Sequence, residues 1–157
     1  MGSDAVDESE LFAAVARSRA RVLLIGRRAL VALGLPVLTA DYDFWLHTDD
    51  LEAFNAALAP LGMLPNRSPA EARSLGRYVL ENGEHIAVIV ARELRALSGE
   101  TLEFEQAWQR KQSLEISDSI QVAMPGLDDL VTKRVAMRPK DQEDIRLLEA
   151  LRTRQRT

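Results

Sequence analysis

The segment from residue 22 to residue 46 constrains the fold more than any other part of the chain. It opens with the apolar run Val22–Ile25, which Gly26 ends, and closes with Asp43–Leu46, which is apolar after its first residue. Short apolar runs bounded by turn residues are typical of buried strands. Between them, Arg27–Leu33 is expected to form a short helix, because Gly34 follows it as a suitable left-handed cap. The segment therefore predicts a strand, a helix and a second strand.

A further strong signal comes from the runs Tyr78–Leu80 and Ile86–Val90, which are short and apolar. Asn82 and Gly83 stand between them. Because both residue types tolerate positive φ, this pair favours a type I′ turn. We therefore predict a β-hairpin with that turn.

The remaining elements follow from helical spacing, caps and turn residues. Residues 64–74 include two prolines and several polar residues, which predict a loop with room for one helical turn. A second hairpin is expected to pair Ser113–Ile116 with Ile120–Ala123 and to turn at Asp118-Ser119. Helices are expected over residues 7–19, 48–58, 101–109, 127–137 and 141–152. This order predicts the α+β class, with a mixed β-sheet flanked by helices and with C-terminal helices.

Composition narrows the class of protein. A length of 157 residues suits a single domain over residues 1–157, with flexible ends at 1–7 and 153–157. The absence of cysteine excludes disulfides and cysteine metal sites. No apolar run approaches the ~20 residues that span a bilayer and no signal-peptide pattern opens the chain, so we expect no membrane contact and a cytoplasmic location. The formal net charge of −4 argues against a dedicated nucleic-acid binder.

The residues best suited to chemistry are Asp41 and Asp43, at the start of the second predicted strand. Alternate strand residues share a face, so the two carboxylates are expected to converge ~7 Å apart. Two carboxylates on one face repel each other unless a cation lies between them, and oxygen ligands of this kind suit Mg²⁺, or Mn²⁺ in its place. The alternative is structural, because Asp also favours loop–strand junctions for its turn-forming side chain.

Gly26 stands where a strand meets a helix, and the backbone N–H groups there favour an anion such as a triphosphate. Arg27 and Arg28 add positive charge at the same place. The sequence thus predicts a phosphate site beside a metal site. A plain turn glycine is the alternative for Gly26.

The arrangement resembles a known family in two separate blocks. The first is a strand, Gly26, a short helix, Gly34 and the pattern Thr39-x-Asp41-x-Asp43. The second runs from Met124 to Lys133 and from Arg138 to Ile145. Both blocks are similar to the minimal nucleotidyltransferases, including the bacterial toxin–antitoxin-linked nucleotidyltransferase proteins, and the likeness spans roughly residues 22–151.

The resemblance implies transfer of a nucleoside monophosphate from a nucleoside triphosphate to a hydroxyl acceptor on an RNA, a protein or a small molecule. It implies that Asp41 and Asp43 are catalytic and hold the metal. The residues that it implies for nucleotide binding are Gly26, Arg27, Arg28, Thr39, Lys133 and Lys140. Asp141 and Asp144 match positions in the family's closing helices, where they either pair with basic residues or cap a helix.

The chain departs from the family at two positions that bear on catalysis. Arg27 stands where a second small residue normally follows Gly26, and Ala87 stands where a third carboxylate normally lies. Glu84 and His85 are the nearest substitutes for that carboxylate. Two hypotheses therefore stay open. One is a metal-dependent nucleotidyltransferase; the other is a catalytically impaired module that acts by nucleotide or protein binding, for example with a small protein partner in a toxin–antitoxin pair.

Overall fold

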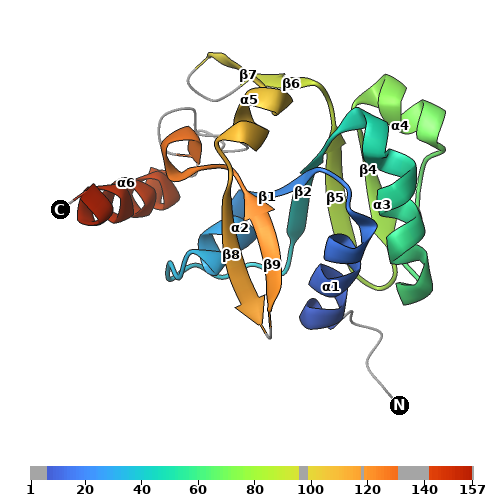
Figure 1. The fold of residues 1–157 in the computed structure, drawn as a ribbon, viewed down its shortest axis with the longest axis horizontal. Coiled ribbons are helices and arrows are strands. Elements are labelled where there is room, and N and C mark those ends of the chain that lie inside the picture. The colour runs from blue at the N-terminus through green and yellow to red at the C-terminus, as the bar shows by residue number, and fades with distance from the viewer. Residues whose placement is uncertain (1–6, 96–98, 118, 131–141, 157) are drawn as a thin grey trace.

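The computed structural model describes residues 7–95, 99–117, 119–130 and 142–156, and a five-stranded mixed sheet lies at its centre (Figure 1). The strand order is β1-β2-β5-β4-β3, in which β2 and β5 run parallel and every other neighbouring pair is antiparallel. These strands are β1 (Val22–Ile25), β2 (Tyr42–Leu46), β3 (Leu64–Pro65), β4 (Arg77–Glu81) and β5 (His85–Val90). The predicted α+β class with a mixed, helix-flanked sheet is confirmed.

The helices and two small hairpins surround this sheet. The α-helices are α1 (Glu8–Ser18), α2 (Gly26–Ala32), α3 (Leu51–Leu58), α4 (Pro69–Leu75), α5 (Phe104–Gln109) and α6 (Gln142–Arg156), and short 3-10 turns span Thr48–Asp50 and Ala59–Leu61. The hairpins are β6 (Glu93–Arg95) with β7 (Thr101–Glu103), and β8 (Gln112–Ser117) with β9 (Ile120–Met124). Among the described residues, no helix is both long enough and apolar enough to cross a bilayer.

One face of the sheet is covered by α1 and α3, which lie side by side over it (Figure 1). Asp7 caps α1 by accepting hydrogen bonds from the backbone N–H groups of Ser9 and Glu10, so the helix begins where its apolar face begins. Phe12 of α1, Phe44 of β2 and Phe54 of α3 are almost fully buried and meet edge to face. This face therefore holds the main core.

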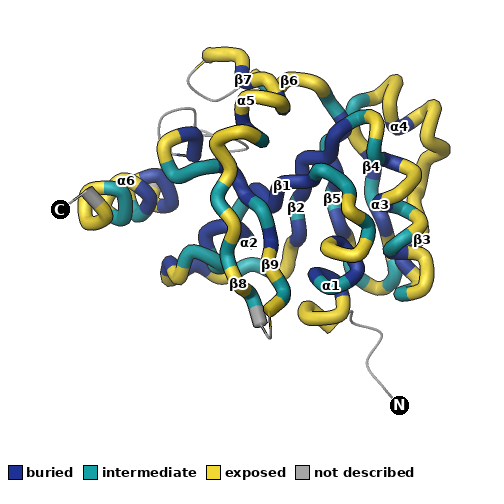
Figure 2. The backbone as a smooth tube through the Cα atoms, in the orientation of Figure 1, coloured by how far each residue is buried: buried dark blue, intermediate teal, exposed yellow. Residues whose placement is uncertain are grey.

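The opposite face is covered only in part. α5 packs Phe104 against Trp45 of β2, with ring centroids 5.2 Å apart, in a cluster that also contains Leu23 and Ile25 of β1. Figure 2 shows the strands of the sheet mostly buried, whereas α4 is mostly exposed. The part of this face over β4 and the start of β5 lies outside the α5 cluster.

Two predictions about the middle of the chain were wrong in part. Residues 64–74 hold more regular structure than a loop with one helical turn: β3 comes first, and α4 follows it. Ser68 and Glu71 form a reciprocal capping box at the start of α4. The predicted β4–β5 hairpin is confirmed, but its turn is not type I′. The pairing of Glu81 with His85 leaves three residues in the loop, and only Gly83 of these has positive φ. Asn82 instead donates a side-chain hydrogen bond to the carbonyl of Leu61.

The later elements follow the predictions more closely, with one exception. The predicted helix over residues 101–109 begins only at Phe104, because residues 101–103 form β7. The second hairpin is confirmed as β8 and β9. The expected helix over residues 127–137 lies largely outside the described residues, as do Asp118 and Asp141. α6 packs Leu148 in a third cluster with Leu30 of α2.

Candidate active site

Strand β2 places Asp43 at the centre of the partly covered face. Asp43 pairs with Ile25 across the antiparallel β1 and with Ala87 across the parallel β5. Because paired residues point to the same face, the Asp43 carboxylate stands between the end of β1 and the first half of β5. It is partly exposed, whereas Phe44 and Trp45 beside it are fully buried.

Gly26 lies directly against this carboxylate. Its φ is +70°, and a Cβ atom added to it would come within 2.7 Å of the Asp43 Oδ2 atom. Positive φ and close approach are both conditions that glycine alone meets without strain. The glycine that ends β1 thus lets the backbone at the start of α2 lie against the carboxylate, as the strand–Gly–helix order predicted.

Asp41 lies one residue before β2 and is exposed. Its backbone N–H donates to the Thr39 Oγ1 atom at 3.1 Å, so Thr39 holds the loop that leads into the strand. Tyr42 points to the covered face, where its ring meets that of Phe12. Because Asp41 precedes β2, the strand does not fix its side chain, and its convergence with Asp43 stays a prediction.

The Arg27 side chain is engaged in contacts within the fold. Its Nε atom lies 3.0 Å from Oδ2 of Asp144 on α6, and its Nη1 atom donates to the carbonyl of Leu38 at 3.0 Å. The side chain of Asp144 is only 8% exposed, so the pair is partly buried. Of the two alternatives for Asp144, the structure thus shows pairing with a basic residue.

Arg28 is also committed to local contacts. Its Nη2 atom donates to the carbonyl of Thr39 at 3.1 Å and its Nε atom to that of Asp41 at 3.3 Å. The guanidinium lies over the Tyr42 ring, 4.1 Å from the centroid. Both arginines therefore fix the loop that carries Asp41. Nucleotide contacts by Arg27, Arg28 and Thr39 stay predictions, and Lys133 and Lys140 lie outside the described residues.

Ala87 stands beside Asp43 in the register, where the sequence placed the missing third carboxylate. The two suggested substitutes do not fill this place. Glu84 lies in the β4–β5 loop, and His85 is 73% exposed, with its Nδ1 atom 3.3 Å from Oε1 of Glu81. Within the described part of the chain, no group of three or more His, Cys, Asp or Glu side chains is placed to hold a metal ion.

The donor set therefore fits one divalent cation and does not fit two. Mg²⁺ is commonly held by one or two carboxylates together with substrate phosphates, and Asp41 and Asp43 are the two carboxylates that the sequence predicted for it. A second ion of a two-metal site needs further anionic ligands, and Ala87 supplies none.

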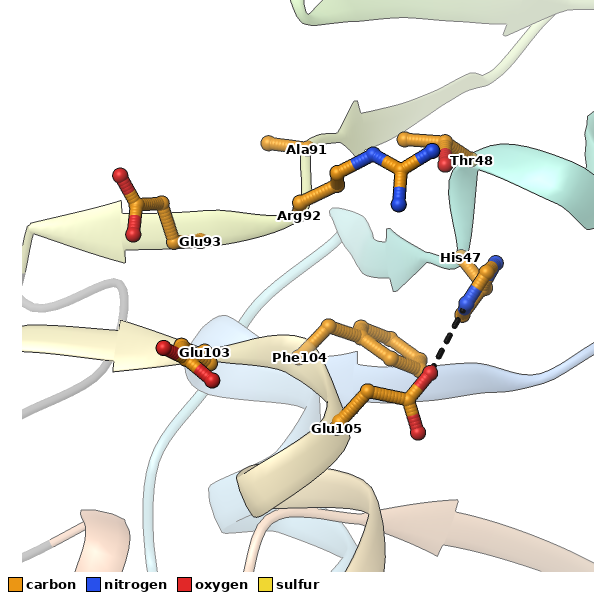
Figure 3. A pocket seen from close by; sticks show the side chains of 8 residues that line it. All are labelled: His47, Thr48, Ala91, Arg92, Glu93, Glu103, Phe104 and Glu105. Carbon is orange, nitrogen blue, oxygen red and sulfur yellow. Dashed lines mark hydrogen bonds and ion pairs between the residues drawn. The ribbon is translucent and has the colours of Figure 1, made fainter.

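A different pocket, of about 420 Å³, lies at the other end of β2 (Figure 3). His47 uses both ring nitrogens there: Nδ1 accepts the N–H of Asp49 at 3.0 Å, and Nε2 lies 3.0 Å from Oε1 of Glu105. Glu93 and Glu103 also line this pocket, and Arg92 is the one arginine among its described lining residues. Its excess of carboxylates is unsuited to a triphosphate. No local pattern in the sequence indicates that His47 is buried and uses both ring nitrogens.

Sequence analysis also missed two arginines near Ala87. Arg77 begins β4 and pairs with Ile89, and Arg67 precedes α4. Both line a pocket that includes Ala87. Strand alternation from Val79 would have placed Arg77 on the face of Asp43, but residue 67 fell in the segment that was predicted to be a loop.

Comparison with known proteins agrees with this arrangement at the level of the fold. No family model matches the chain, and no curated protein matches it. A crystal structure from Thermotoga maritima, described as a "putative nucleotidyltransferase", superposes with a TM-score of 0.58 over 92% of this chain and 88% of that chain, at 11% sequence identity. The chain therefore has a nucleotidyltransferase-like fold.

Proposed function

We propose that this protein binds a nucleoside triphosphate together with one Mg²⁺ or Mn²⁺ at Asp41 and Asp43, and transfers the nucleoside monophosphate to a hydroxyl acceptor. The observation that carries the proposal is the contact between Gly26 and the Asp43 carboxylate. It joins a cradle for phosphate to a ligand for the cation on one face of a nucleotidyltransferase-like sheet.

The chain's own residues have separate parts in this proposal. Asp41 and Asp43 hold the cation, which when bound neutralises charge on the triphosphate. Gly26 lets the Asp43 carboxylate lie against the backbone at the start of α2, so that a cation held by Asp43 stands beside that helix end. Arg27 and Arg28 hold the loop from Leu38 to Asp41 in place through its carbonyl groups. They position the carboxylate loop and need not touch phosphate to do so.

A second candidate function is favoured by Ala87. With no carboxylate there, the second cation of a two-metal reaction lacks a protein ligand. The chain would then be a catalytically impaired module that acts by nucleotide or protein binding, for example with a small protein partner in a toxin–antitoxin pair. Both candidates share the nucleotide site and differ in the rate of transfer.

One set of variants tests the shared site and separates the two candidates. Mg²⁺ with ATP or another nucleoside triphosphate should raise the melting temperature of the wild type, because a ligand that binds only the folded state stabilises it. Asp41→Asn with Asp43→Asn should abolish the rise. A rise that persists in this double variant would place the nucleotide elsewhere and refute the proposal.

Ala87→Asp is the matching gain-of-ligand variant. It should tighten Mg²⁺ binding in calorimetry and speed the transfer of labelled nucleotide, since it restores a carboxylate beside Asp43. Metal-dependent transfer by the wild type supports the enzyme. Nucleotide binding with transfer only in Ala87→Asp supports the impaired module.

A further inference from the structure

A pocket of about 420 Å³ lies on the partly covered face, over β4 and β5. Its floor is formed by Val79, Ala87 and Ile89, which register places in neighbouring rows of the sheet. The row that contains Ala87 and Val79 continues across β2 to Asp43. The pocket is therefore the direct continuation of the candidate active site, two strands away from it or about 10 Å.

Ala87 controls the passage between the two regions. Its methyl group is the only side-chain atom between the Asp43 carboxylate and Val79 in this row. A longer side chain at this position would narrow the passage between Asp43 and the pocket. With alanine, an anionic group in the pocket meets no acidic side chain from the pocket floor.

The rim of the pocket carries two guanidinium groups. Arg67 and Arg77 are both exposed, and the structure shows no hydrogen bond or ion pair from either side chain to another described residue. The Glu71 carboxylate accepts the backbone N–H of Ser68 in the capping box, which lowers its pKa, and Arg67 is close enough to contribute to this lowering. No Asp or Glu lines the pocket, although the chain as a whole carries a net charge of −4.

Asn66 completes the polar rim. Its Oδ1 atom accepts the N–H of Val79 at 2.9 Å, and its own N–H donates to the carbonyl of Val79 at 2.9 Å. These hydrogen bonds fix the side-chain amide of Asn66. Its oxygen is engaged by Val79, and its NH₂ group is the part that can donate to a ligand. Two guanidinium groups and an amide donor above an apolar floor match a phosphate group attached to an organic body, since arginine binds phosphate through two parallel hydrogen bonds.

We infer that this pocket is the acceptor subsite, and that the acceptor is a hydroxyl compound that carries a phosphate group bound by Arg67 and Arg77. The inference rests on the proposed function. The acceptor oxygen forms a bond to the α-phosphorus of the nucleoside triphosphate, the bond from that phosphorus to the bridging oxygen breaks, pyrophosphate leaves, and the hydroxyl proton passes to water. Binding of the acceptor's phosphate group by the two arginines places the acceptor's hydroxyl group on the Ala87 side of Asp43.

Binding of the acceptor class is measured without Mg²⁺ or nucleotide, so that the metal site has no part in the result. The probes are ribose 5-phosphate, ribose and a single-stranded RNA hexamer. We expect the wild type to bind either the RNA together with ribose 5-phosphate or the RNA alone. Ribose, which has no phosphate group, should not bind. Arg67→Ala with Arg77→Ala should weaken this binding about tenfold or more, because each charge-assisted hydrogen bond lost is among the stronger kind.

The matched control is Arg17→Ala with Arg19→Gly. It removes the same charge from exposed arginines at the end of α1, and glycine suits the positive φ of residue 19. Binding in this control should equal that of the wild type. Ala87→Leu fills the passage without changing charge, and it should slow transfer to phosphate-bearing acceptors while the nucleotide-induced rise in melting temperature stays.

The outcomes separate this inference from the function on which it rests. RNA binding alone identifies a nucleic-acid strand as the acceptor, and binding of ribose 5-phosphate as well identifies a phosphate monoester. Equal binding by the arginine double variant and its control overturns the inference, as does failure of every probe to bind. If that double variant loses instead the rise with Mg²⁺ and nucleotide, the arginines belong to the nucleotide site and the acceptor assignment falls while the proposed function stands.

Discussion

The two faces of the central sheet are built from the same strands and are used differently. On the face under α1 and α3, Phe12, Phe44 and Phe54 form a closed aromatic cluster. On the other face, Asp43 and Ala87 stand one residue away from these core positions and are partly exposed. Stability is thus concentrated on one face, and the residues proposed for chemistry lie on the other.

This separation has a consequence for substitution. A change at Asp43 or Ala87 does not open a cavity in the main core, because strand alternation turns these side chains away from it. A chain can therefore exchange a carboxylate for alanine at position 87 and keep its fold. The fold by itself then says little about whether catalysis is retained.

The largest effect should come from breaking the covered face. Phe44→Ala removes a fully buried ring that contacts Phe12 and Phe54, and should lower the free energy of unfolding by about 3–5 kcal/mol. Val79→Ala, on the partly covered face, is the control and should cost about 1 kcal/mol or less because Val79 is half-buried. Urea denaturation measures both. Similar losses in the two variants would show that the faces do not differ in this way.

An intermediate effect is expected at the tie between α2 and α6, which belongs to neither face. Arg27→Ala leaves the buried Asp144 carboxylate without its guanidinium and should destabilise the protein by about 1–3 kcal/mol. Adding Asp144→Asn should recover part of the loss, because the group left behind is then neutral. A double-mutant cycle in urea measures this coupling. A coupling near zero would mean that the pair is only a surface contact.

A structural feature can be predicted from the sequence when the residues that cause it are neighbours in the chain. Strand alternation and the apolar runs predicted β1, β2 and the β4–β5 hairpin. The strand–Gly–helix order predicted that Gly26 lies beside the Asp pair, and in the structure it lies against Asp43. The loop of the hairpin was wrong because Asn82 serves the carbonyl of Leu61, which lies 21 positions away. No local pattern carries that information.

The site was predictable to the same extent. The resemblance to the nucleotidyltransferases implied that Ala87 takes the place of a carboxylate beside the Asp pair, and the strand register does set Ala87 next to Asp43. The partner of Arg27 lies 117 positions along the chain, and the partners of Arg28 are backbone carbonyls. Neither kind of partner can be recognised from residue types near the arginines. Charge near a glycine suggests phosphate from the sequence, whereas the structure shows that these charges are already used.

The smallest expected effect is a pH dependence that sharpens the comparison between the two ends of β2. At the end away from Asp43, Asp50 accepts from the backbone N–H and the Nε atom of Arg21, both at 2.8 Å. These hydrogen bonds hold the pKa of Asp50 below its usual value near 3.8. A lowered pKa in the folded state adds stability above the unfolded pKa, and this stability is lost as the pH falls through the folded pKa. The wild type should therefore exceed Asp50→Asn in unfolding free energy at about pH 7, by no more than about 1 kcal/mol because the pair is partly solvated. The difference should shrink below about pH 4. Urea denaturation of both proteins across this range measures it, and a difference that stays constant with pH would show that the Asp50 carboxylate acts through shape and not through charge.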